Sequence, residues 1–238
     1  MKKILCFALM VSASLIVLTG CSSFVPEKEK EDTFSVKKDD AKKLDVEINL
    51  GVGEMTVAKG ATEWMEGSAQ YNIKKLAPKV HYKQRGKTGD LVIEHKGSTK
   101  VRIGNIKNVW DIELNEDIPM DLSVETGASK ARLDLRGLKL ENLDIETGVG
   151  DLYVNLGGDW KESFETNIET GVGQTTVILP SKVGVKITTE KGIGSINLEG
   201  FIAKGKGVYV NEAFEQADVI LDINSEIGVG DITFKLDK

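Results

Sequence analysis

A short glycine-containing phrase, Gly-x-Gly in five copies and Gly-Ala-Ser in the copy at Gly127, recurs six times along the chain, with alternating apolar and polar residues on both sides. In the copy around Gly148, apolar residues occupy odd positions up to the corner and even positions after it. They are Leu143, Ile145 and Val149, followed by Leu152, Val154 and Leu156. Because strand side chains point alternately to two faces, a change of parity requires a corner, a bulge or a tight turn. Each copy therefore predicts a strand, a corner and a second strand, with these apolar side chains inside.

The spacing of the copies indicates how the strands are arranged. The first glycines of the copies are Gly51, Gly127, Gly148, Gly171, Gly192 and Gly228. Glycine reaches positive φ without a steric clash, so Gly-x-Gly suits a corner. The regular middle copies favour an all-β, right-handed parallel β-helix-like solenoid, in which each coil of about 22 residues stacks on the last. An antiparallel β meander is the alternative, since a two-residue hairpin turn also changes parity.

The N-terminus has the features of a targeting signal. Two lysines precede an apolar run over residues 4–18, which is short for a membrane-spanning helix and typical of a signal peptide. The sequence Leu-Thr-Gly-Cys at 18–21 resembles a bacterial lipobox. We therefore expect residues 1–20 to be cleaved and Cys21 to carry acyl chains such as palmitate. The protein would then be a lipoprotein at the extracytoplasmic face of the cell membrane.

Charge and repeat content divide the rest of the chain. Residues 21–43 carry many charges of both signs, which predicts a lipidated, solvated tether in which residues 33–36 could already form a short strand. Residues 44–108 hold the first copy and a less regular, lysine-rich stretch, and residues 109–238 hold the other five. We expect an N-terminal toast-rack-like domain over 44–108 and a C-terminal β-solenoid over 109–238.

These features together resemble the bacterial toast-rack family. The resemblance rests on the lipobox, the GVGE turn that starts at Gly51, the stretch WDIELNEDIPMDLSVETGA from Trp110, and the tandem ETGVGD phrases. The family is related to putative-adhesin β-helix domains and to the outer domain of LiaF-type proteins of the cell-wall antibiotic response. The resemblance implies a right-handed stack of short strands and a role in adhesion or in envelope-stress signalling.

The composition offers little material for catalysis. The formal net charge of −6 argues against a general nucleic-acid binder, and two histidines and two cysteines leave few metal ligands or nucleophiles. Four glutamates precede successive corners and could stack in a ladder, but no two of them are distinguished as acid and base. They are Glu146, Glu169, Glu190 and Glu226. We expect no enzymatic activity, no metal and no cofactor; a polysaccharide-active enzyme is the remote alternative.

The candidate ligand surface combines one tryptophan with a basic cluster. The ring of Trp64 is suited to stacking on a sugar, and the basic residues stand out in an acidic chain. They are Lys74, Lys75, Lys79, Lys83, Arg85 and Lys87. We predict a binding or scaffold protein of the cell envelope, either an adhesin or a protein that binds a wall polymer. The alternative is an accessory of envelope-stress signalling with a membrane-protein partner.

Overall fold

The computed structural model describes residues 28–95 and 106–238, so the expected signal peptide and Cys21 lie outside the described residues. The described residues form one 13-stranded sheet with two short 3-10 helices. The elements are β1 (Lys30–Val36), β2 (Lys43–Lys59), β3 (Met65–Tyr71), η1 (Lys74–Leu76), β4 (Pro78–Arg85), β5 (Thr88–His95), β6 (Asn108–Leu114), β7 (Pro119–Asp134), β8 (Lys139–Asn155), β9 (Phe164–Leu179), β10 (Gly184–Glu199), β11 (Ile202–Gly205), β12 (Val208–Val210), η2 (Phe214–Gln216) and β13 (Ile220–Leu236).

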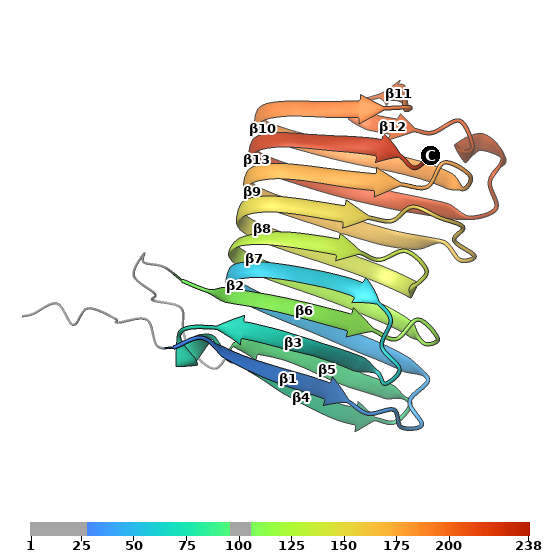
Figure 1. The fold of residues 1–238 in the computed structure, drawn as a ribbon. Helices are drawn as coiled ribbons and strands as arrows, with labels where there is room; N and C mark the ends of the chain where they lie inside the picture. The colour runs from blue at the N-terminus through green and yellow to red at the C-terminus, as the bar shows by residue number, and fades with distance from the viewer. Residues whose placement is uncertain (1–27, 96–105) are drawn as a thin grey trace, which may run out of the picture.

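Six of the strands are long and bent, and each contains one copy of the glycine phrase. They lie side by side in the order β2, β7, β8, β9, β13 and β10, and every pairing among them is parallel. Each strand bends at the left in Figure 1, so that its two halves form two layers around an apolar core. The parallel pairing excludes an antiparallel meander for these strands, and an all-β stack of repeated coils is confirmed.

The two glycines of a corner serve different purposes. A Cβ on the first glycine of β8, Gly148, would lie 2.6 Å from the carbonyl oxygen of Gly127 in the neighbouring strand. The second glycine, Gly150, has a φ of +138°, which other residues rarely adopt. The first glycine therefore permits close stacking of the coils, and the second permits the bend.

The residue between the two glycines faces solvent, although the apolar pattern placed it inside. Val149 is 54% exposed and Ile193 is 74% exposed, whereas Leu152 and Val154, which follow the corner of β8, are buried. The residue between the glycines occupies the convex apex of the bend, where no second layer covers it. The predicted change of parity at the corner is confirmed. The last inward-facing residue before the corner of β8, however, is Thr147 rather than Val149.

The coils do not stack in sequence order, which corrects a second expectation. The last strand, β13, lies between β9 and β10, so β10 is the end of the stack although it precedes β13 in the chain. All copies share the same corner and the same alternation, so the repeat pattern does not encode which strand pairs with which. The β11–β12 hairpin then closes over the first half of β10, because β12 pairs with Lys186–Thr188.

The N-terminal end of the stack is built from shorter strands. β5 pairs with the first half of β2 and β6 with its second half, so together they take the place of one coil. The antiparallel pairs β4–β5, β1–β3 and β3–β6 complete this end. β1 extends the fold into residues expected to be tether, and β2 pairs with β7, so one sheet spans the boundary expected at residue 108.

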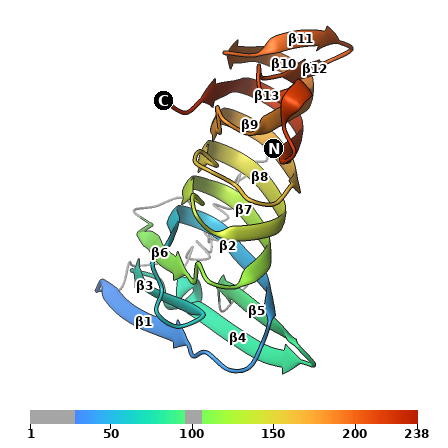
Figure 2. The same ribbon diagram turned by 90° about the vertical axis from the view of Figure 1, so that its right-hand side faces the viewer.

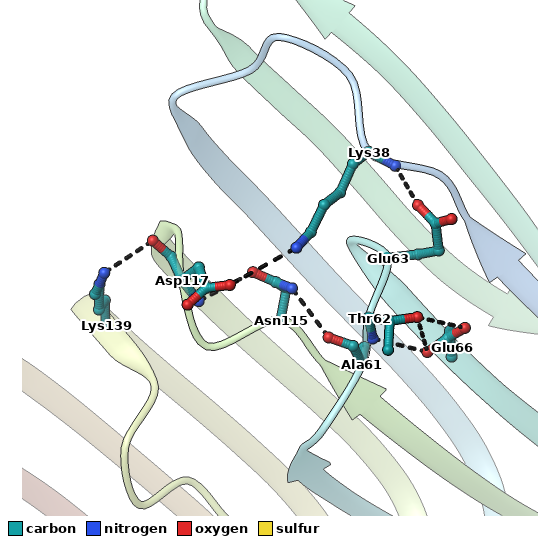
Figure 3. A network of polar contacts seen from close by, with 8 residues as sticks. All are labelled: Lys38, Ala61, Thr62, Glu63, Glu66, Asn115, Asp117 and Lys139. Atoms are coloured by element: carbon teal, nitrogen blue, oxygen red, sulfur yellow. Dashed lines mark hydrogen bonds and ion pairs between the residues drawn. The ribbon is translucent and has the colours of Figure 1, made fainter.

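The loops on the side opposite the corners are held together by polar contacts (Figure 3). The buried Asn115 donates to the carbonyl oxygen of Ala61 at 2.9 Å and accepts the N–H of Asp117 at 3.0 Å. Lys139 donates to the carbonyl oxygen of Asp117 at 2.9 Å, and the Lys38 ammonium lies 3.7 Å from its carboxylate. These contacts join the loops before β2, β3 and β7 to one another and to the start of β8.

His95 is a half-buried hydrogen-bond acceptor, which predicts a pH-dependent stability. The N–H of Gly51 donates to His95 Nε2 at 2.7 Å, and burial lowers the pKa of His95 from its ordinary value of 6.5. The unfolded chain therefore binds more protons, so the contribution of His95 is complete above about pH 6.5 and falls as the pH drops below it. We expect His95→Gln to reduce the loss of unfolding free energy between pH 7.5 and 5.5 in urea titrations. A loss between pH 7.5 and 5.5 that His95→Gln leaves unchanged would contradict the assignment.

Candidate binding surfaces

The predicted basic cluster lies on η1, β4 and the β4–β5 turn, at the N-terminal end of the stack. Alternation along β4 places Lys79, Lys83 and Arg85 on one exposed face, with His81 between them. Lys74 and Lys75 in η1 and Lys87 in the β4–β5 turn are also exposed. We call these six lysine and arginine residues the basic strip. β4 pairs only with β5 among the described residues, so the strip lies on an edge strand (Figure 1).

Acidic residues of β5 neutralise the basic strip only in part. Arg85 forms an ion pair with Asp90, and Lys79 lies 3.9 Å from Glu94. Within residues 28–95 and 106–238, no ion pair engages the ammonium groups of the other four, Lys74, Lys75, Lys83 and Lys87. The strip therefore keeps an excess of positive charge in a chain whose formal net charge is −6.

Trp64 is not part of an exposed surface, which corrects its predicted role. It is 6% exposed, its Nε1 donates to Asp39 at 3.0 Å, and the ammonium of Lys38 lies 5.6 Å from its ring centroid. Tyr82 of β4 donates to the same Asp39 carboxylate at 2.8 Å. Burial and the bond to Asp39 raise the pKa of Tyr82 to about 12. Trp64 is thus linked to Tyr82 of β4 through Asp39, and its buried ring is unavailable for stacking on a sugar.

The predicted glutamate ladder is present on the first half of the coils. Residues at one position pair in register across four neighbouring strands and into β10: Glu125, Glu146, Glu169, Glu226 and Glu190. All five are exposed, and no ion pair joins them to a basic side chain in the described residues. They are equivalent positions of one column on one face, so no two of them face each other as an acid and a base across a cleft.

A groove on the second half of the coils was not predicted. It has a volume of about 440 Å³ and is lined by residues that include Glu54, Lys130, Asp151 and Gln174. Arg132 lies over the ring of Tyr153 with 4.2 Å between the guanidinium carbon and the ring centroid. The signal for this pair was present in the sequence, because each residue stands five positions after the first glycine of its copy.

Two further findings concern ions and membranes. No group of three or more His, Cys, Asp or Glu residues is arranged to hold a metal ion within residues 28–95 and 106–238. Over the same residues, no helix is long and apolar enough to cross a membrane.

Comparison with known proteins places the chain in a family. The family described as the N-terminal domain of toast_rack, DUF2154, matches residues 25–178. A solved structure named as a putative cell adhesion protein from Clostridium sporogenes is 32% identical, with 88% of this chain and 100% of that chain covered and a TM-score of 0.80. A putative adhesin from Bacteroides fragilis is 14% identical, with 87% of this chain and 97% of that chain covered and a TM-score of 0.29. No curated protein matches the sequence. With the glycine corners, the parallel stack and the family match in agreement, this chain belongs to the toast-rack family.

Proposed function

We propose that this protein is a non-enzymatic binding protein of the bacterial cell envelope, held at the membrane by lipid on Cys21, whose basic strip binds an anionic wall polymer. The observation that carries the proposal is the row of exposed Lys79, Lys83 and Arg85 on an edge strand of an acidic protein. A relative of 32% identity named as a putative cell adhesion protein supports a binding role.

The position of the basic strip fits an extended polyanion. Alternate residues of a strand are about 6.8 Å apart, so β4 presents a straight row of cations to a chain that carries regularly spaced charges. The strip and β1 lie at the same end of the stack, at the bottom of Figure 2. A lipid on Cys21 would therefore keep the strip near the inner layers of the wall.

Removal of three charges from β4 tests the basic strip. We expect the triple variant Lys79→Gln, Lys83→Gln, Arg85→Gln to bind synthetic poly(glycerol phosphate) roughly 100-fold more weakly, at about 1 kcal/mol for each basic residue near an anionic surface. Isothermal titration calorimetry at low and at physiological salt measures this loss. Binding by the unaltered protein should also weaken as salt rises, because the contacts are charge pairs.

A matched control separates the strip from net charge. Lys161, Lys182 and Lys206 are exposed in the loops before β9, before β10 and before β12, away from β4, and their replacement by glutamine removes the same charge. The control should bind like the unaltered protein. Equal weakening by both triple variants would show a general charge effect, and no binding by the unaltered protein would refute the proposal.

The two alternative functions have less support. A polysaccharide-active enzyme needs an acid and a base of different character, and the glutamate column offers equivalent positions on one face. An accessory of envelope-stress signalling needs a membrane-protein partner, and the basic strip fits a polyanion more directly. Capture of such a partner in cells is the outcome that would favour signalling.

A further inference from the structure

A row of exposed apolar side chains runs along the corners of the stack. The residue between the two glycines of a corner pairs in register with its equivalent across β8, β9, β13 and β10. These residues are Val149, Val172, Val229 and Ile193, and their exposed fractions are 44–74%. They are four of the five large apolar side chains that are exposed in the described part of the chain. Exposed apolar residues are thus gathered in one line rather than scattered, which is typical of an interaction surface.

The four side chains form a narrow projection, which we call the apolar ridge. Each of them lies at the convex apex of a bend, between two glycines that have no side chain. The corners stand in line at the left edge of the stack in Figure 1. Paired strands are about 4.8 Å apart, so the ridge is about 14 Å long. A straight rod can contact such a ridge along its whole length, whereas a convex domain surface would touch only one or two of its side chains.

Carboxylates line both sides of the apolar ridge. Three residues before each ridge residue stands a member of the glutamate ladder: Glu146, Glu169, Glu226 and Glu190. Asp151 and Asp231 follow the ridge on its other side, and the one basic residue in these four corners, Lys191, donates to the carbonyl oxygen of Gly194 at 2.9 Å. Within residues 28–95 and 106–238, none of the six carboxylates forms an ion pair with a basic side chain. The ridge is therefore apolar along its crest and acidic on both flanks.

This combination fits an amphipathic helix whose apolar stripe is bordered by lysine or arginine. One turn of a helix rises about 5.4 Å, and paired strands are about 4.8 Å apart, so successive turns meet successive coils. Over three spacings the mismatch grows to about 2 Å, which the long flexible side chain of lysine absorbs. An anionic lipid surface or an anionic polymer would instead be repelled by the carboxylates on both flanks.

We infer that the apolar ridge binds a free cationic amphipathic peptide, which lies as a helix along the corners of β8, β9, β13 and β10. Its apolar side chains at helical spacing lie on both sides of the crest, and its basic side chains pair with Glu169 and Glu226 on one flank and Asp231 on the other. About ten residues of helix span the ridge. The peptide folds as it binds, because so short a helix is not stable alone in water.

The inference is independent of polymer binding. The basic strip lies on η1, β4 and the β4–β5 turn and shares no residue with the apolar ridge or its flanks. Failure of the ridge to bind a cationic peptide would leave the polymer proposal unchanged, and failure of the strip to bind a polyanion would leave the ridge unchanged.

A synthetic peptide tests the inference on the full chain carrying Cys21→Ser. The probe has about 16 residues of leucine and lysine, long enough to form a helix, with the leucines on one helical face. Fluorescence anisotropy of the labelled probe measures binding. We expect Val172→Thr with Val229→Thr to weaken it about tenfold, because both changes keep the side-chain shape and remove apolar contact. Glu169→Gln with Glu226→Gln should weaken it about fivefold, through the loss of two exposed ion pairs.

Matched controls separate the ridge from general adhesion and from net charge. Ile202→Thr changes the fifth exposed apolar residue, on β11, and Glu162→Gln with Glu212→Gln removes the same charge from loops away from the corners. Both controls should bind the probe like the unaltered chain. A second probe of the same composition, with its leucines spread around the helix, should bind at least about tenfold more weakly. Unchanged thermal melting of each variant shows that the fold is intact.

Four results would overturn the inference. The first is equal binding of the two probes, which would show charge attraction alone. The second is a valine double variant that binds like the unaltered chain. The third is equal weakening by the control pair of glutamates and by the pair beside the ridge. The fourth is an unaltered chain that binds no probe, or that binds it only after residues 1–20 are deleted, which would assign the ridge to that segment.

Discussion

Replacing Gly150 with alanine is expected to lower the free energy of unfolding by at least about 3 kcal/mol. The φ of +138° is strained for alanine, and its Cβ would overlap the carbonyl oxygen of Ser129 in β7. Because that oxygen belongs to a paired strand, relief requires both coils to move apart. Urea unfolding followed by far-UV circular dichroism measures the change.

Gly158→Ala is the matched control for this change. Gly158 also has a positive φ, +103°, but nothing lies within 4 Å of the position of its Cβ. We therefore expect a loss of only about 1 kcal/mol, from backbone strain alone. Equal losses at Gly150 and Gly158 would show that close stacking of the corners does not limit stability.

Replacing Cys21 with serine is expected to release essentially all of the protein from the membrane fraction. Acyl chains stabilise membrane attachment by about 0.8 kcal/mol for each buried methylene, and serine cannot accept them as a thioether. Incorporation of a labelled fatty acid and fractionation of cells measure the two consequences.

The other cysteine provides the control for lipidation. Cys6 lies in the segment expected to be cleaved, so Cys6→Ser should leave both the label and the membrane location unchanged. A Cys21→Ser protein that still carries the label, or that remains with the membrane, would contradict lipid anchoring.

The repeat predicted the fold because the same pattern, a corner between two strands of alternating apolar and polar residues, occurs six times in the sequence. Gly148 and Gly150 mark a corner, and the alternation around Leu152 and Val154 assigns an inward face without further information. The predicted inward position of Val149 was wrong, because the sequence does not distinguish a valine at the convex apex of a bend from a valine in the core. The insertion of β13 between β9 and β10 was equally inaccessible, since identical phrases do not specify neighbours.

The candidate surface was also predicted only as far as local alternation along one strand assigns residues to a face. Lys79, Lys83 and Arg85 are alternate residues, and a strand places alternate residues on one face. The burial of Trp64 depends on Asp39, 25 residues earlier, which no local pattern connects to it. Pairs that join distant segments, such as Asn115 with Ala61, are set by the tertiary fold alone.

The most direct test is to identify the molecules that contact the basic strip in cells. A photo-crosslinking residue at His81, in the middle of the strip, is compared with one at Thr176 on β9, in the full chain with Cys21 unaltered. Mass spectrometry then identifies the captured peptides and glycans. We expect an anionic wall polymer to be attached at His81 and absent at Thr176. A single membrane protein captured at His81, with no polymer, would contradict it and favour the signalling accessory.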